Sequence, residues 1–174
     1  MADNERYHQI RAALHAAGIS ECEYEWPGLL AGLLSRGFVP GSREISKLAA
    51  DLLNGGETLP GSVVAFLASE GLELKERLDH AADDLFSFPD AKESSAQRLQ
   101  ALSDLAHGLT LGLTADPQKG LADRLPPGPL LDFVQSLSDI TRVDTEADLD
   151  EEDLKSVLDY MRQQVLDEYK RSKA

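Results

Sequence analysis

Apolar side chains recur every three or four residues along most of this 174-residue chain. That spacing places them on one face of an α-helix. Leu99, Leu102, Leu105, Leu109 and Leu113 form one such stripe. No segment alternates apolar and polar residues for long enough to indicate a β-strand. The pattern therefore predicts an all-α fold, a multihelical bundle of about six to seven helices.

Capping residues, glycines and prolines mark where these helices begin and end. Ser42 and Asp150 are N-cap candidates, and an Asn-Gly-Gly run at 54–56 is a helix stop. Gly71 lies in the middle of a long predicted helix, which it could bend or split. The predicted helices span about residues 3–17, 22–37, 42–53, 60–88, 94–113, 130–140 and 150–173.

Prolines and glycines interrupt the helical pattern in the stretch 114–129. They are Pro117, Gly120, Pro126, Pro127, Gly128 and Pro129. Such a composition is typical of a loop or linker. We expect a single all-α domain over residues 1–174, which this linker could divide into two subdomains, 1–113 and 129–174.

Two pairs of glycines stand four residues apart inside apolar runs, Gly28 with Gly32 and Gly108 with Gly112. A glycine in a helix interior costs roughly 1 kcal/mol relative to alanine, so four of them need a physical reason. Positions i and i+4 share one face of a helix, where two glycines leave a flat strip that another backbone can approach. The pairs predict close helix packing, either within the chain or in a dimer.

The chain is strongly acidic, with 31 carboxylates against 17 lysines and arginines and a net charge of −14. This charge disfavours direct binding to nucleic acid or to an anionic membrane, because both need clustered basic side chains. The negative charge is compatible with binding to a basic protein partner. It is equally compatible with a charge that only keeps the protein soluble.

Carboxylates are densest in the segment 144–153, hereafter the acidic segment. They are Asp144, Glu146, Asp148, Asp150, Glu151, Glu152 and Asp153. One interpretation is a solvated loop followed by a helix start whose dipole favours negative charge. The other is a docking surface for a basic partner. A calcium loop of the EF-hand type is excluded, because its sixth and twelfth positions would be Leu149 and Lys155.

The chain contains few residues of the types that form catalytic or metal-binding sites. Cys22 is the single cysteine. Of the four histidines, His8 and His15 could share a helix face, but two histidines alone do not make a zinc site, which needs three or four ligands. Neither a nucleophile elbow nor a phosphate-binding glycine loop is present. We therefore predict no catalytic residues, no cofactor and no metal. The start of the chain lacks a secretory signal pattern and no apolar stretch would span a bilayer, so a cytoplasmic protein is expected.

The order of several short motifs resembles the YgfB/YecA-like family of small acidic bacterial proteins. These motifs are EWPGLLAGLL at 25–34, FSFPD at 86–90, RLQALSDLAHGLTLGL at 98–113, the acidic segment, LDYMR at 158–162 and Tyr169. The resemblance implies an all-α bundle, often dimeric, with no established enzymatic activity. The chain departs from the family at Pro27, where many members have histidine, and at Leu105, where an aromatic residue is usual. It also lacks the cysteine-rich metal-binding motif that some members carry at the C-terminus.

These observations predict a non-enzymatic, homodimeric regulator that binds a cytoplasmic protein partner through an acidic helical surface. A basic, nucleic-acid-binding transcriptional regulator is one such partner. The alternative is a small-ligand binder or an enzyme with a pocket between helices. Trp26, Phe86 and Phe88, with Tyr7 or Tyr24, are the aromatic side chains that could line this pocket.

Overall fold

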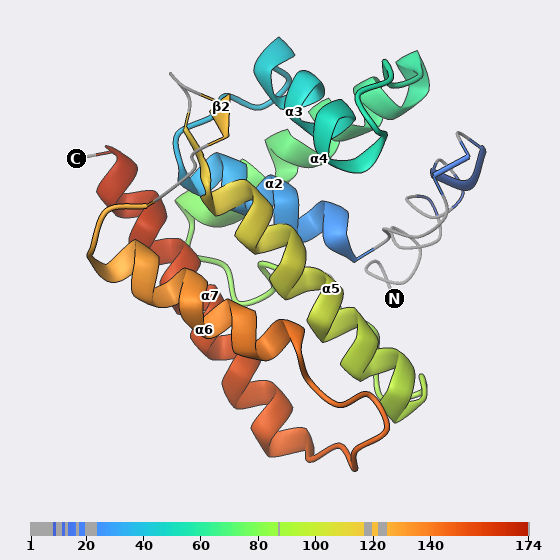
Figure 1. Ribbon diagram of the computed structural model, residues 1–174, viewed down its shortest axis with the longest axis vertical. Coiled ribbons are helices and arrows are strands. Elements are labelled where there is room, and N and C mark those ends of the chain that lie inside the picture. The colour runs from blue at the N-terminus through green and yellow to red at the C-terminus, as the bar shows by residue number, and fades with distance from the viewer. Residues whose placement is uncertain are drawn as a thin grey trace.

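The computed structural model describes residues 24–86, 88–116, 120–121 and 125–173, together with residues 9, 12, 14–16, 18 and 19. The helices and strands with defined bounds among them are α2 (Glu25–Ser35), α3 (Arg43–Leu53), α4 (Gly61–Asp79), α5 (Ser95–Leu113), β1 (Ala115–Asp116), β2 (Gly120–Leu121), α6 (Pro129–Thr141) and α7 (Glu151–Lys173). Figure 1 shows their arrangement. The predicted all-α multihelical bundle is confirmed.

The first predicted helix, 3–17, falls largely outside the described residues. Residues 9, 12 and 14–16 are helical, and the side chain of Leu14 is buried in the core. Tyr7 and Cys22 also lie outside the described part of the chain.

Helix α2 is buried on nearly all sides. Trp26 and residues 28–35 are buried, and α4, α5 and α7 all pack against this helix. A helix that is apolar around its whole circumference belongs in the interior of a fold. In Figure 1, α2 crosses behind α5. The position of α2 therefore sets where its three neighbours can lie.

The two glycine pairs face each other across the α2–α5 contact. A Cβ atom added to Gly32 would lie 2.8 Å from the Cα atom of Gly112, closer than real Cβ contacts come. One added to Gly28 would overlap the backbone of Leu105 and lie 2.8 Å from the nitrogen of Leu109. The two backbones thus touch directly. This contact is within one chain, and it leaves no room for any side chain between the helices.

Helices α6 and α7 join the same hydrophobic core as the rest of the chain. Phe133 of α6 packs edge-on against Tyr160 of α7, with ring centroids 5.9 Å apart. The hydroxyl of Ser103 in α5 donates a hydrogen bond of 2.6 Å to the carbonyl of Thr141 at the end of α6. The core cluster contains Leu102 together with Phe133 and residues of α7. Side chains from both sides of the stretch 114–129 are therefore packed together.

A short antiparallel strand pair lies within the predicted linker. Ala115 pairs with Leu121, and Asp116 pairs with Gly120. The sequence pattern gave no sign of it, because a two-residue strand is too short for alternation to be visible. No helix among the described residues is long and apolar enough to cross a membrane.

The prediction of one helix over 60–88 is wrong at its C-terminal end, since α4 ends at Asp79. Ala81 adopts a left-handed conformation with φ +49°, and the N–H of Ala82 bonds to the carbonyl of Arg77 at 2.9 Å. This is the hydrogen bond of a Schellman cap, which terminates a helix. The guanidinium of Arg162 in α7 then donates to the carbonyls of Ala81 and Ala82, each at 2.7 Å. At Gly71, by contrast, α4 continues without a break.

We expect Gly108→Ala to lower the free energy of unfolding by about 3 kcal/mol, because overpacking forces rigid backbones apart. The added Cβ would overlap the carbonyl oxygen of Glu25 and lie 2.9 Å from the nitrogen of Leu29. Gly61→Ala is the matched control, because no neighbour lies within 4 Å of a Cβ there. It should change stability by no more than about 1 kcal/mol. Urea unfolding measures both, and equal midpoints for the two variants would show that α2 and α5 are not in backbone contact.

Candidate functional site

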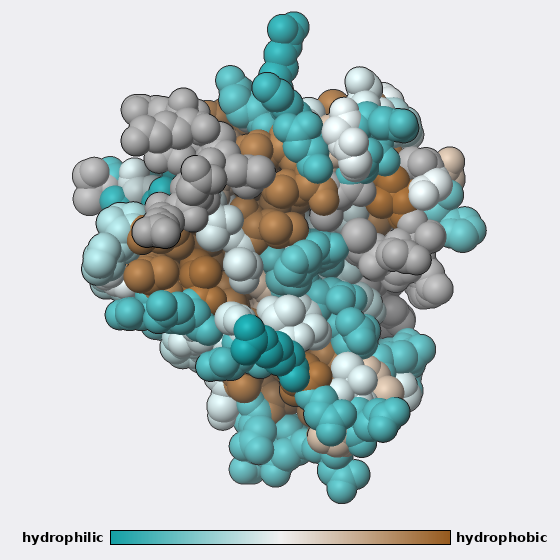
Figure 2. Space-filling model, viewed as in Figure 1, coloured by the Kyte–Doolittle hydropathy of each residue, from teal (hydrophilic) through white to brown (hydrophobic). Residues whose placement is uncertain are grey.

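The acidic segment occupies the loop between α6 and α7 and the first turn of α7, where Figure 2 shows a mostly hydrophilic surface. Asp144 accepts a hydrogen bond from the backbone N–H of Glu146 at 2.9 Å. The side chain of Asp150 accepts from the backbone N–H groups of Glu152 and Asp153, at 2.9 and 3.2 Å. The predicted N-cap at Asp150 is therefore confirmed. Two of the seven carboxylates thus shape the backbone that carries the others.

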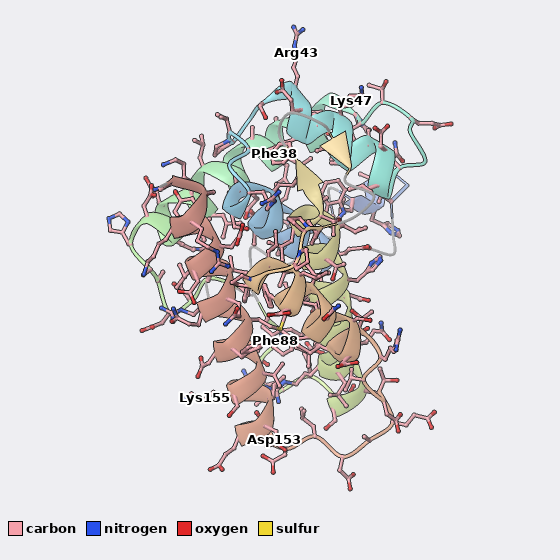
Figure 3. The ribbon with its side chains drawn as sticks, turned by 60° about the vertical axis from the view of Figure 1, so that its left-hand side comes forward. Phe38, Arg43, Lys47, Phe88, Asp153 and Lys155 are labelled. Carbon is pink, nitrogen blue, oxygen red and sulfur yellow. The ribbon has the colours of Figure 1, made fainter. Side chains whose placement is uncertain are left out.

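Glu151 forms an ion pair with Arg98 of α5. The four remaining carboxylates of the segment are exposed and make no ion pair or side-chain hydrogen bond with another described residue. They are Glu146, Asp148, Glu152 and Asp153. Figure 3 shows Asp153 projecting outward from the end of α7. These four negative charges face solvent, on a backbone to which Asp144 and Asp150 are hydrogen-bonded.

A cleft of about 220 Å³ lies beside the acidic segment, between α7 and the irregular chain after α4; we call it the α7 cleft. Its apolar lining is Phe86, Phe88, Leu154 and Leu158. Its charged lining is Asp83, Arg98, Glu151, Lys155, Asp159 and Arg162. In Figure 3, Phe88 lies toward the interior, while Lys155 projects from α7.

The two arginines of the α7 cleft hold its walls together. Arg98 donates to the carbonyl of Pro89 at 3.3 Å in addition to pairing with Glu151. Arg162 binds the carbonyls after α4 and also lies 3.3 Å from a carboxylate oxygen of Asp83. Both guanidinium charges are thus matched by carboxylates of the same chain. Their hydrogen bonds fix the irregular segment against α5 and α7.

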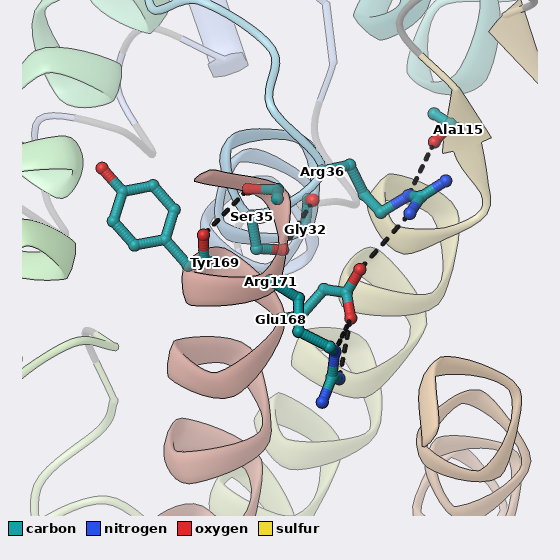
Figure 4. Close-up of polar contacts among 8 residues, drawn as sticks. Gly32, Ser35, Arg36, Ala115, Glu168, Tyr169 and Arg171 are labelled. Atoms are coloured by element: carbon teal, nitrogen blue, oxygen red, sulfur yellow. Dashed lines mark hydrogen bonds and ion pairs between the residues drawn. The ribbon is translucent and has the colours of Figure 1, made fainter. Parts of the chain in front are cut away.

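A second set of polar contacts fixes the other end of α7 (Figure 4). Glu168, with 5% of its surface exposed, pairs with Arg36 at 3.3 Å and with Arg171 at 2.7 Å. Arg36 also donates to the carbonyl of Ala115 at 3.2 Å. A buried carboxylate needs such partners, because an unpaired buried charge is strongly destabilising. This cluster therefore ties α7 to α2 and to β1.

Asp79, at the end of α4, makes a third contact with α7. It accepts from Lys173 at 2.6 Å, from Lys75 at 2.7 Å and from the hydroxyl of Tyr169. These three donors, with Lys173 contributing most, hold the pKa of Asp79 well below its usual range. The ammonium group of Lys173 also lies 4.1 Å from the centre of the Tyr169 ring.

Comparison with known proteins identifies the fold alone. No family model matches the sequence, and no curated protein matches it. Among solved structures, the chain is similar to the crystal structure of the lpg0076 protein from Legionella pneumophila, with a TM-score of 0.69 and 24% sequence identity. The likeness covers 94% of this chain and 93% of that chain. The helical arrangement is therefore shared over nearly the whole length of both proteins.

The structure does not bring the predicted pocket aromatics together. Phe86 and Phe88 line the α7 cleft, whereas Trp26 lines a separate cavity of about 30 Å³ between α2 and α4. The indole nitrogen of Trp26 is buried and makes no hydrogen bond with the described residues. Leu85, one residue before Phe86 in the chain, is buried and lines the Trp26 cavity.

His107 pairs with Glu25 across the α2–α5 contact. Asp104 lies near this pair, and burial raises the pKa of its carboxyl. No group of three or more metal-ligating side chains that could hold an ion is found among the described residues. We assign this cluster to the packing of α2 on α5.

Sequence reasoning missed the charged side chains of the α7 cleft other than Glu151. Arg98, Lys155 and Arg162 are spread over two helices, and nothing in their spacing links them. The available signal was that Arg98 and Arg162 are basic residues within the motifs of an otherwise acidic chain.

Asp79→Asn should reduce stability at neutral pH, and this deficit should shrink in acid. A carboxyl whose folded pKa is depressed stabilises the fold above its unfolded pKa, about 3.9, and the stabilisation is lost as pH falls through the folded pKa. We expect the Tm gap between the wild-type protein and the variant to narrow between about pH 5 and pH 2. Exposed Asp84 offers a control, since Asp84→Asn should leave Tm nearly unchanged at every pH. If the difference in Tm between the wild-type protein and Asp79→Asn stayed constant with pH, the ionisation of Asp79 would not stabilise the fold.

Proposed function

We propose that this protein is a non-enzymatic interaction protein that binds a basic segment of a protein partner through the acidic segment. The observation that carries the proposal is the group of four exposed carboxylates, on a backbone hydrogen-bonded to the side chains of Asp144 and Asp150. The four are Glu146, Asp148, Glu152 and Asp153. A preorganised array of like charge attracts an oppositely charged partner and speeds encounter.

The partner class that fits best is a cytoplasmic nucleic-acid-binding regulator. Such proteins carry clustered lysines and arginines, which is the complement of a chain with net charge −14. Occupying that basic face would inhibit nucleic-acid binding by the regulator. Membership of the YgfB/YecA-like family is part of the same proposal, and the order of motifs along the chain supports it.

Homodimerisation belongs to the proposal as well. The glycine pairs are not available for it, because Gly28 and Gly32 already face Gly108 and Gly112 within one chain. A dimer would therefore use another surface.

A small-ligand binder or enzyme is the weaker candidate. The α7 cleft has a volume of about 220 Å³, below the roughly 300–1,000 Å³ of most small-molecule pockets. Its two arginines are engaged in holding the cleft walls. The cleft supports recognition of a side chain better than recognition of a whole metabolite.

The test is capture of partners from cell lysate by the tagged protein, compared with a variant in which the four exposed carboxylates are neutralised. The substitutions are Glu146→Gln, Asp148→Asn, Glu152→Gln and Asp153→Asn. Exposed ion pairs contribute about 0.2–1 kcal/mol each, so losing four should reduce captured partner about tenfold. Capture by the wild-type protein should also fall between 50 and 500 mM salt, because salt screens exposed charges.

The matched control neutralises four exposed carboxylates elsewhere and keeps the same net charge as the test variant. Its substitutions are Glu44→Gln, Asp51→Asn, Glu57→Gln and Glu76→Gln. Partners that depend on the acidic segment should be retained by this control. Equal loss with both variants, or salt-independent capture with both, would contradict the proposal.

A further inference from the structure

We infer that the α7 cleft binds one large apolar side chain of the partner's basic segment, either aromatic or leucine-sized. This inference rests on the proposed function, and it adds a second contact: an apolar side chain of the partner, here called the anchor, that enters the cleft. The cleft opens beside the first turn of α7, where the acidic segment ends, and Glu151 belongs to both. A segment bound to the exposed carboxylates would therefore lie next to the cleft.

The size of the cleft suits a single ring. Its volume is about 220 Å³, whereas a closed, wholly apolar cavity of roughly 150 Å³ already holds benzene. The α7 cleft differs from such a cavity in being open and partly charged, so the comparison concerns its size alone. Its lining includes Phe86, Phe88 and Leu158, which are only partly buried and pack against the core. Aromatic and aliphatic side chains that fill such a site typically dominate the energy of an interface.

The charges around the α7 cleft favour a cationic neighbour for this anchor over an anionic one. Arg98 and Arg162 are already matched by Glu151 and Asp83, so they present no unpaired positive charge to an anion. Lys155 stands four residues before Asp159 on the same face of α7, and the two charges offset each other. The acidic segment, which adjoins the cleft at Glu151, then supplies uncompensated negative charge.

The geometry of α7 sets the spacing between anchor and cation in the partner. Leu158, in the cleft, and Glu152, in the acidic segment, are separated by about 9 Å along the axis of α7, at about 1.5 Å per residue, and by about a third of a turn around it. An extended chain needs about three to four residues to follow this path. The inferred ligand is therefore a short peptide in which lysine or arginine follows or precedes an aromatic or leucine residue by two to four positions.

Capped synthetic peptides test this inference by NMR titration of the full chain at 50 mM salt. The probe is acetyl-Trp-Gly-Lys-Lys-Arg-amide; alanine replaces tryptophan in a second peptide, and three glutamates replace the basic residues in a third. The tryptophan-basic peptide should bind at least tenfold more tightly than the alanine peptide. It should shift the amide signals of residues 154–159 and of Phe88.

Variants of the protein distinguish the contribution of the apolar cleft to peptide binding from that of the acidic segment. Leu158→Lys fills the cleft with a chain whose charge can reach water, and it should abolish the preference for tryptophan over alanine. Leu72→Lys is the control, because Leu72 on α4 is already 59% exposed and lies outside the cleft lining. It should keep the preference. Lys155→Glu changes only an exposed rim residue and should tighten binding of the tryptophan-basic peptide severalfold. Thermal unfolding by circular dichroism confirms that each variant is folded.

Each outcome has a definite meaning. Equal affinity for the tryptophan and alanine peptides would overturn the anchor while leaving charge-based binding by the acidic segment intact. Stronger binding of the glutamate peptide would overturn both the inference and the proposed function. A tryptophan preference that survives Leu158→Lys would place the anchor elsewhere and overturn the inference.

Discussion

The structure depends on one contact, the touching backbones of α2 and α5. Gly28 and Gly32 on one helix meet Gly108 and Gly112 on the other, and no side chain fits between them. Close approach brings the flanking leucines of both helices into one core. Since α4 and α7 pack on α2, and α6 packs on α5, these three helices are all placed relative to this contact.

Polar contacts then fix α7 to that frame at both ends. Near its C-terminus, the buried Glu168 and the Asp79 cluster hold the helix to α2 and α4. Near the start of α7, Arg98 of α5 pairs with Glu151 and binds the carbonyl of Pro89. In the middle of α7, Arg162 binds the irregular chain after α4. Arg98 therefore both shapes the α7 cleft and holds the end of the acidic segment. Surface charge and an apolar anchoring site are in this way presented side by side.

Local signals in the sequence predicted much of the fold. Ser42 and Asp150 cap α3 and α7 as predicted, because a cap needs only residues within one turn. The end of α4 was missed because its alanines favour helix, and Arg162, 80 residues further on, binds the carbonyls beyond it. The α7 cleft was missed for the same reason, as its walls come from distant segments. The glycine pairs predicted close packing, but their pairing within one chain emerged only in three dimensions.

Native-state hydrogen exchange measures the central role of the α2–α5 contact most directly. Amides that open only on global unfolding exchange most slowly, so they mark the part of a fold on which the rest depends. We predict that amides of α2 and α5 around the glycine pairs are the slowest and share one opening free energy, equal to that of global unfolding. Those of α3 and the start of α7 should open earlier. If α2 amides instead exchange faster than those of α3 or α6, the bundle is not organised around this contact.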